Sequence, residues 1–497
     1  MPNSQASSTY SSNTDSADPK EVVLVFPGKF KAPDPQVPLS LLYLASSLNQ
    51  DFSVRILDMR IEDYRKFNIG DPVFVGVSCM SGLQINYALE FARHIREKKP
   101  SIPIVWGGVH PSLLAEQTAR SPYVDVVVRG EGELIIKELA NKLALNQPVD
   151  SVAGLTYKAN GIIKNNQDGE IIELDDIPIA LPYDLLQLDK YPSIKAGRFH
   201  VQTSRGCPHR CGFCYNSYFN KKKWRGKSAK RVLDEIQYLL NKFPETKIID
   251  PIDDNFFVDR KRVEDICHGI LERKLDFQWR ANCRFDYLST YDKAFLQLIE
   301  KAGCVELDFG GESGSERIQQ LICKDVTADE MLTSVGNLHR WAPSIEPYVS
   351  WMSGLPGETD QDLAKTFDLM DKLRVINPKT QHFGIFIYTP FPSPVMQYLP
   401  KEYTPPQSLE AWGNVEVFQF NPPWHTKEHL EKLHAVSTVA RCTFYPQSRI
   451  KERDLAFKIA YSMMNKIAKY RWQNRNFSFP IELKLADAAA KRLKGFL

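Results

Sequence analysis

Two series of short apolar runs alternate with amphipathic segments along this chain. Each run of the first series ends in a small, polar or glycine-bearing turn, and the segments 38–48 and 84–98 carry apolar residues at helical spacing. Apolar strands that alternate with amphipathic helices predict an open parallel sheet with helices on both faces. We therefore predict a Rossmann-like, doubly wound α/β domain over residues 21–150. Its predicted strands are residues 21–26, 52–57, 73–77, 102–106 and 124–128.

The second series begins at residue 199 and contains about six strand–helix repeats. Polar or glycine-bearing residues follow each strand, and side chains placed repeatedly at strand C-termini are typical of a β/α barrel. Because the number of repeats falls short of the eight of a full barrel, we predict a partial (β/α)6 TIM-type barrel over residues 198–398. Its predicted strands are residues 199–203, 247–252, 278–282, 305–309, 348–352 and 383–387.

Three further segments lack this alternation. Residues 1–20 are rich in Ser, Asn, Thr and Asp, which predicts disorder. Prolines interrupt residues 151–197, and we predict an irregular, packed linker there. After residue 399 the strands stop, and apolar spacing predicts a helical C-terminal domain over residues 399–497. Its predicted helices are residues 430–439, 455–470 and 481–497.

Composition narrows the class of protein. The chain has 497 residues, enough for several domains, and a net charge of +3, which does not favour a nucleic-acid or anionic-membrane partner. No apolar run approaches the roughly 20 residues that cross a bilayer. The N-terminus also lacks the charged and apolar regions of a signal peptide. These features predict a cytoplasmic protein without a transmembrane segment.

Three of the nine cysteines lie close together, at Cys207, Cys211 and Cys214, and the others are scattered. This is not a disulfide framework, so a metal site is the better interpretation. A structural zinc normally takes four ligands, and a three-ligand catalytic zinc usually includes a histidine. A 4Fe-4S cluster held by three cysteines leaves one iron open for another ligand. The chemistry favours the cluster, while zinc and a chance arrangement remain open at this point.

The motif Cys207-Pro-His-Arg-Cys211-Gly-Phe-Cys214, with aromatic Phe213 before the last cysteine, resembles the signature of the radical S-adenosylmethionine (SAM) enzymes. The resemblance implies that the three cysteines hold a 4Fe-4S cluster whose open iron binds SAM. Reductive cleavage of SAM then yields a 5′-deoxyadenosyl radical, which abstracts hydrogen from an unactivated carbon. It also implies an external reductant such as flavodoxin or ferredoxin.

The strand ends that follow are similar to further motifs of this family, in the same order. The resemblance places Asp253, in Asp253-Asp-Asn-Phe256, near the SAM amino group, and Arg284 near its carboxylate. Glu312 and Ser313, in the Gly-Gly-Glu-Ser-Gly segment, would bind the ribose hydroxyls. Gly354 would lie near the adenine. Phe213 belongs to the same set of SAM contacts.

The N-terminal domain resembles the cobalamin-binding domain that is fused to one large subclass of radical SAM enzymes. Where many cobalamin domains have Asp-x-His-x-x-Gly, this chain reads Asp58-Met-Arg-Ile-Glu-Asp63, which predicts cobalamin bound without an imidazole on cobalt. We interpret His110 as a turn residue rather than a cobalt ligand. The resemblance implies cobalamin contacts at Ser81, Leu83, Gly107, Gly108, Val109, Gly130 and Glu131.

Together these features predict a cobalamin-dependent radical SAM methyltransferase that methylates an unactivated carbon through the 5′-deoxyadenosyl radical and methylcobalamin. The alternative is a cyclase or rearranging enzyme of the same architecture without net methyl transfer. A third hypothesis, from another class, is a degenerate binding or scaffold protein. The sequence predicts a small-molecule substrate, apolar or natural-product-like, and determines neither its identity nor the oligomeric state.

Overall fold

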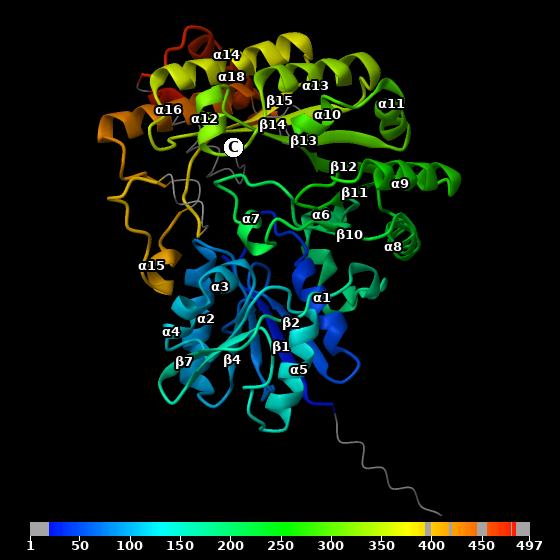
Figure 1. Ribbon diagram of the computed structural model, residues 1–497, viewed down its shortest axis with the longest axis vertical. Coiled ribbons are helices and arrows are strands. Elements are labelled where there is room, and N and C mark those ends of the chain that lie inside the picture. Colours follow the sequence, from blue (N-terminus) through cyan, green and yellow to red (C-terminus); the bar gives the residue numbers. More distant parts are fainter. Residues whose placement is uncertain (1–18, 393–398, 417–419, 445–454, 479, 484–497) are drawn as a thin grey trace, which may run out of the picture.

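A computed structural model describes residues 19–392, 399–416, 420–444, 455–478 and 480–483. The N-terminal sheet and its helices lie below the second sheet in Figure 1, and the longer C-terminal helices lie on the side of the second sheet. Residues 1–18, where disorder is predicted, and most of the predicted helix 481–497 lie outside the described residues.

The N-terminal sheet has the strand order β2-β1-β3-β4-β5-β6-β7, and its first five strands are parallel. Alternate residues of β1 face two separate cores: Val22 and Leu24 pack with α1 and α5, whereas Val23 and Val25 pack with α2. Helices on both faces confirm the doubly wound domain. The elements are β1 (Glu21–Phe26), α1 (Leu39–Leu48), β2 (Ser53–Asp58), β3 (Val75–Ser78), α2 (Gln84–Lys98), β4 (Ile104–Gly107), α3 (Val109–Leu113), α4 (Ala115–Arg120), β5 (Val126–Val128) and α5 (Glu133–Ala144).

The prediction of irregular structure between residues 151 and 197 is wrong for its first part. Strands β6 (Leu155–Ala159) and β7 (Ile162–Asn165) form a hairpin that joins the N-terminal sheet antiparallel to β5. Asn160 and Gly161 connect them with φ of 52° and 78°. Asn-Gly is the preferred pair for such a turn, so the sequence did contain the signal. The short elements that follow are η1 (Leu174–Asp176), η2 (Tyr183–Leu185), η3 (Leu188–Lys190) and α6 (Pro192–Lys195).

The second sheet has six parallel strands in the order β15-β14-β13-β12-β11-β8, with β8 and β15 at opposite edges. This arrangement confirms the predicted partial barrel. Its strands are β8 (Arg198–Val201), β11 (Ile248–Pro251), β12 (Gln278–Cys283), β13 (Cys304–Glu312), β14 (Glu346–Ser353) and β15 (Gln381–Ile387). Its helices are α8 (Ala229–Lys242), α9 (Arg260–Glu272), α10 (Phe285–Leu288), α11 (Lys293–Lys301), α12 (Glu316–Leu321), α13 (Ala328–Trp341) and α14 (Asp360–Ile376).

The face of these strands that points away from the helices is charged. Ile249 and Trp279 belong to the core formed with α8 and α9, so their neighbours Asp250 and Arg280 point into the barrel. Arg280 donates to Asp250 at 2.9 and 3.1 Å and to Glu306 at 3.0 Å. The interiors of β/α barrels are usually filled by bulky apolar side chains, so this barrel has an unusually polar interior.

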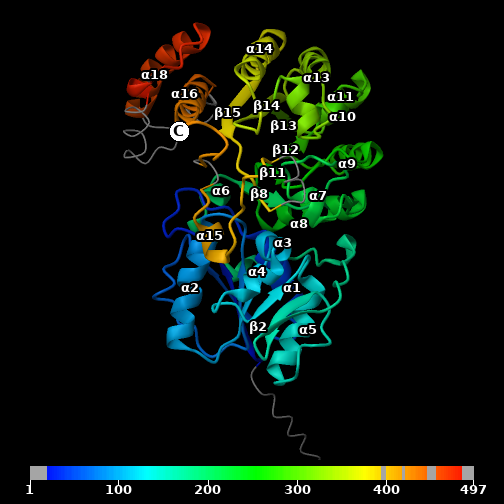
Figure 2. The ribbon, with the colours of Figure 1, turned by 60° about the vertical axis from the view of Figure 1, so that its left-hand side comes forward.

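The C-terminal segment contacts both domains. Helix α16 (Lys427–Phe444) packs on β15 and on α18 (Leu455–Gln473), whereas α15 (Leu409–Gly413) lies against α2 of the N-terminal domain. Figure 2 shows α15 beside α2, below the other C-terminal helices. Asn86 Nδ2 donates to the Gly413 carbonyl at 2.8 Å. Within the described ranges, no helix is both long and apolar enough to cross a membrane.

Tyr191 fastens the linker to the N-terminal sheet. Its side chain is fully buried, and its hydroxyl donates to Asp58 Oδ2 at 2.9 Å. We expect Tyr191→Phe to lower the free energy of unfolding of the N-terminal domain by about 1.5–3 kcal/mol, the range for hydrogen bonds to charged groups. Urea unfolding, followed with a probe of the N-terminal domain, measures this loss. Tyr238→Phe, which loses only a partly exposed contact from Lys242, is the control, and equal effects of the two variants would contradict the prediction.

Candidate functional site

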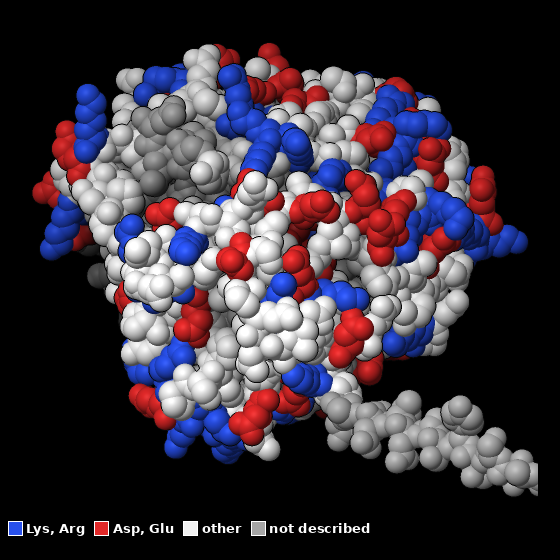
Figure 3. All heavy atoms as spheres, turned by 60° about the horizontal axis from the view of Figure 1, so that its bottom comes forward, with Lys and Arg blue, Asp and Glu red and all other residues white. Residues whose placement is uncertain are grey.

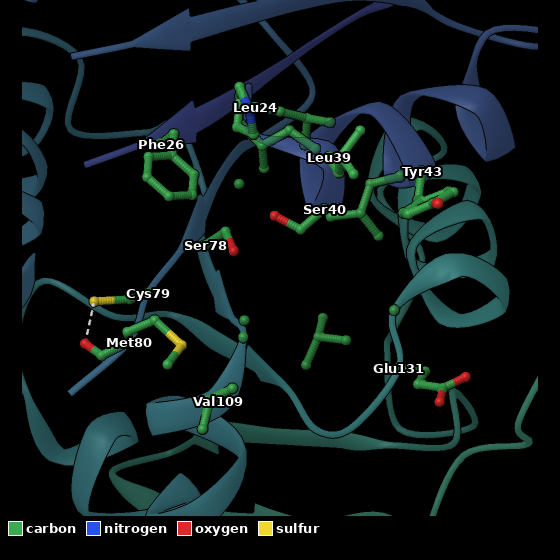
Figure 4. Close-up of a pocket in the computed structure, with 18 of the residues that line it drawn as sticks. Leu24, Phe26, Leu39, Ser40, Tyr43, Ser78, Cys79, Met80, Val109 and Glu131 are labelled. Atoms are coloured by element: carbon green, nitrogen blue, oxygen red, sulfur yellow. Dashed lines mark hydrogen bonds between the residues drawn. The ribbon is translucent and has the colours of Figure 1, made fainter. Parts of the chain in front are cut away.

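A cavity of about 480 Å³ lies where the C-terminal edge of the N-terminal sheet faces the barrel. Ligands of open α/β sheets bind at this edge, beyond the carboxyl ends of the strands. Figure 4 shows Ser40, from α1, and Ser78, at the end of β3, directed into the cavity. The barrel domain completes the wall, so both domains contact any ligand held there. Its contributions are Gln202, Arg205, Tyr215, Phe219, Asn220, Ile252 and Asp254.

Glycines form part of the cavity wall. Gly108 has φ of 97°, and a Cβ there would lie 2.8 Å from the Cys79 carbonyl oxygen, so only glycine fits. A Cβ on Gly130 would meet no atom within 4 Å, which shows that this backbone faces open space. Bare backbone lets a flat ligand approach closely. These features fit the corrin ring of cobalamin.

Five of the seven predicted cobalamin contacts line the cavity: Gly107, Gly108, Val109, Gly130 and Glu131. Ser81 and Leu83 are not among its lining residues. Leu83 is 41% exposed, just before α2. Ser81 Oγ instead contacts His110 Nδ1 at 2.9 Å.

His110 points away from this cavity. It is fully buried, its ring lies 5.7 Å from that of Trp412, and it is not among the lining residues. Burial lowers the pKa of His110 to about 4. The neutral ring therefore supports the packing of α15 against the N-terminal domain.

Arg60 takes the place that histidine has in Asp-x-His-x-x-Gly. Its Nε donates to Asp58 Oδ1 at 2.8 Å and its Nη2 donates to Asp58 Oδ2 at 2.6 Å. The guanidinium carbon lies 4.1 Å from the centre of the Phe26 ring, and both side chains line the cavity. Arginine stays protonated in proteins and offers no lone pair to a metal.

The three clustered cysteines lie on the loop between β9 (Ser204–Arg205) and α7 (Asn216–Phe219). Cys211 is buried, whereas Cys207 and Cys214 are half-buried. Burial raises the pKa of the Cys214 thiol to about 12, so a cation is needed to hold it as a thiolate. In the described part of the chain, no three His, Cys, Asp or Glu side chains lie close enough together to bind a single metal ion. A cubane cluster makes a different demand, because each cysteine binds its own iron.

Positive charge surrounds Cys211. Arg284 Nη1 lies 3.4 Å from Cys211 Sγ, and Arg284 Nη2 donates to the Lys324 carbonyl at 2.7 Å. Lys324 is buried, and its Nζ lies 3.0 Å from Glu312 Oε1 and 5.6 Å from the centre of the Phe213 ring. Burial lowers the pKa of Lys324, but Glu312 and Cys211 outweigh this effect and raise it. The predicted residues Phe213, Arg284 and Glu312 thus meet beside Cys211, together with a lysine that the sequence did not indicate.

Asp253 binds the chain that leads into the cysteine loop. It is fully buried and accepts hydrogen bonds from the Thr203 backbone N–H at 2.7 Å, the Ser204 hydroxyl at 2.6 Å and the Thr203 hydroxyl. Its carboxylate is therefore already engaged by the chain. The next two residues face the site more directly: Asp254 lines the cavity, and Asn255 Nδ2 lies 3.8 Å from Cys207 Sγ.

The turn after β14 holds Gly354, with φ of 80°. Its N–H donates to Glu358 Oε2 at 2.6 Å, and its carbonyl accepts from Trp424 Nε1 at 3.0 Å. Burial raises the pKa of Glu358 to about 8, which favours a neutral carboxyl group. Ser313 is also buried, and its hydroxyl lies 3.3 Å from Thr366 Oγ1. The C-terminal segment thus covers the predicted adenine region.

Two family models match this chain: the B12 binding domain over residues 30–140 and the radical SAM superfamily over residues 201–370. A Pyrococcus horikoshii protein named as an uncharacterised methyltransferase is 31% identical over 84% of this chain and 90% of its own length. The anaerobic magnesium-protoporphyrin IX monomethyl ester cyclase of Rubrivivax gelatinosus is 26% identical, over 65% of this chain and 56% of its own length.

Among solved structures, the cobalamin-dependent SAM radical enzyme OxsB with bound aqua-cobalamin covers 96% of this chain with a TM-score of 0.71. This chain covers 75% of OxsB at 18% identity, so the likeness shows the shared fold. Together with the glycine-lined cavity and the three-cysteine loop, these matches show that the chain belongs to the radical SAM superfamily, as a cobalamin-dependent radical SAM enzyme with an N-terminal B12-binding domain.

Proposed function

We propose that this enzyme is a methyltransferase that methylates an unactivated carbon of a small molecule. One observation carries the proposal: residues beside the cysteine loop, among them Arg205 and Asp254, line the same cavity as the glycines of the N-terminal sheet. A methyl carrier in that cavity would therefore face the site where the radical forms. When bound, the cluster and SAM supply the radical, and cobalamin supplies the methyl group.

The residues around Cys211 suit the SAM side of this reaction. Arg284 and Lys324 are buried cations that can pair with the SAM carboxylate, and such charge-assisted contacts are strong in a buried site. Glu312 is a carboxylate that can accept from both ribose hydroxyls. Phe213 and Trp424 border the same region and would exclude water from it.

The cyclase alternative shares this arrangement, because the two reactions differ only in how the substrate radical is quenched.

The polar barrel interior supports a substrate that carries polar groups, since Asp250, Arg280 and Glu306 retain side-chain exposures of 15%, 17% and 15%. An apolar substrate, as predicted from the sequence, would leave these charges without solvation. The face of the molecule seen in Figure 3 mixes Lys and Arg with Asp and Glu.

Substrate turnover tests the methyltransferase proposal directly. We expect the reconstituted protein, supplied with SAM carrying an isotope-labelled methyl group, a reductant and cell extract, to form a product heavier by one labelled CH2 unit. Mass spectrometry of the extract detects this gain. A product that loses hydrogens or gains oxygen without label would favour the cyclase alternative instead.

Cluster ligation has a simple test. We expect Cys207→Ala, Cys211→Ala and Cys214→Ala each to abolish reductive SAM cleavage and the cluster absorption after anaerobic reconstitution, because each removes the ligand of one iron. Cys267→Ala, on the buried face of α9, should retain both signals. Full cleavage activity in any of the three loop variants would exclude that cysteine as a ligand.

The cobalt environment follows from Arg60. We expect the electron paramagnetic resonance (EPR) spectrum of bound cob(II)alamin to show no hyperfine splitting from a protein nitrogen, because Arg60 offers no lone pair and His110 faces away. His110→Ala should leave this spectrum unchanged. An imidazole splitting that disappears in His110→Ala would overturn our assignment of both residues.

A further inference from the structure

An ion-pair network joins the cysteine loop to the cavity of the N-terminal domain. We call it the interdomain clamp, and it consists of Arg205 and Arg225 from the barrel domain and Glu131 and Glu133 from the N-terminal domain. Arg205 Nη1 lies 3.0 Å from Glu131 Oε2, and Arg205 Nη2 lies 2.6 Å from Glu133 Oε1. Arg225 Nη2 pairs with Glu131 Oε1. The side chains of Arg205, Glu131 and Glu133 are at most 11% exposed, so solvent screens these pairs only weakly.

The two arginines of the clamp would repel each other without the glutamates. Arg205 and Arg225 stand directly opposite each other in the small antiparallel sheet of β9 and β10 (Arg225–Gly226). Like charges at directly opposed positions destabilise a strand pair. Glu131 contacts both guanidinium groups, so a carboxylate of the other domain offsets the repulsion between the two arginines of this strand pair.

A rigid connection leads from the clamp to the cluster ligands. A single residue, Gly206, separates Arg205 from Cys207. Gly206 has φ of 86°, and a Cβ there would lie 2.0 Å from the Lys223 carbonyl oxygen, so the backbone is tightly packed at this point. Its N–H also donates to Asp254 Oδ2 at 3.0 Å. A displacement of Arg205 would therefore be transmitted to Cys207.

The clamp is also part of the cavity wall. Arg205, Glu131 and Glu133 all line the cavity, and the Arg205 guanidinium lies 5.4 Å from the centre of the Tyr43 ring, another lining residue. A ligand in the cavity consequently contacts the clamp, and the cysteine loop begins directly after the clamp residue Arg205. Burial raises the pKa of Glu131, whereas Arg205 and Arg225 act in the opposite direction and favour its charged form.

Building on the proposed function, we propose that Arg205 is a positioning residue that couples the two cofactor sites. Through its ion pairs with Glu131 and Glu133 it holds the cysteine loop at a set distance from the cobalamin cavity. Because SAM binds at the cluster and cobalamin lies against the clamp, a ligand at either site favours the clamped arrangement of the two domains that the other site needs. Binding of SAM and of cobalamin is therefore cooperative, and by linkage each ligand tightens the other by the same factor.

Titrations of the full-length, cluster-reconstituted protein test this coupling without a substrate. Hydroxocobalamin is titrated with and without SAM under anaerobic conditions, and the ratio of its two dissociation constants is the coupling factor. We expect SAM to tighten cobalamin binding about tenfold in the wild type, within the roughly 5–150-fold range of ordinary couplings. In Arg205→Met the ratio should fall to about one, and in Arg205→Lys, which keeps the charge but loses the two-pronged contact, it should be intermediate.

The matched control is Arg475→Met. Arg475 also bridges two carboxylates, Asp368 and Asp371, but it joins the chain just after α18 to the barrel helix α14. It should retain the wild-type coupling factor. If Arg205→Met fails to fold, Glu133→Gln removes one arm of the same clamp and should lower the factor.

The outcomes separate this inference from the proposed function. A wild type that binds no cobalamin would overturn the proposed function, and the inference with it. A wild type that binds both ligands with a ratio near one, or an Arg205→Met variant that keeps the tenfold ratio, would overturn the inference alone. EPR of the reduced cluster provides a second readout: cobalamin should shift its signal in the wild type and in Arg475→Met, and leave it unshifted in Arg205→Met.

Discussion

The architecture depends on one geometric constraint: the carboxyl ends of two parallel sheets must face the same cavity. Parallel strands place their functional side chains at one edge, so one sheet offers a site for one cofactor. This chain uses two such sheets and brings their edges together at the cavity between Gly108 and Arg205. The linker and α15 serve this arrangement, because Tyr191 bonds to Asp58 and Asn86 bonds to Gly413.

Most of the fold could be predicted from the sequence because its elements are locally encoded. Helices such as α2 and α11 carry regular apolar spacing, and parallel strands buried on both faces read as apolar runs. The hairpin of β6 and β7 was missed because the surrounding prolines suggested irregular chain, although Asn160-Gly161 is a strong turn signal. The place of α15 on α2 could not be predicted, since it rests on contacts more than 300 residues apart in sequence.

The candidate site divides in the same way. Residues within contiguous motifs, such as the three cysteines and Gly107-Gly108, were accessible to sequence reasoning. Lys324 was missed because nothing in its neighbourhood distinguishes a buried lysine from a surface one, and its role appears only when Glu312 is brought within 3.0 Å. Asp253 shows the converse, since its motif suggested a ligand contact while its carboxylate is engaged by Thr203 and Ser204.

Buried charge follows a consistent logic across the site. Four charged side chains near the two cofactor positions have an opposite charge within contact distance: Arg60 with Asp58, Arg284 with Asp286, Lys324 with Glu312, and Arg205 with two glutamates. Isolated charges would be too costly to bury, so each pair also fixes the orientation of its members. The first three pairs each join residues of the same domain, so each can form as its own domain folds. The Arg205 pairs form only when the two domains meet. Assembly of the two domains therefore also fixes the position of the cysteine loop, which begins directly after Arg205.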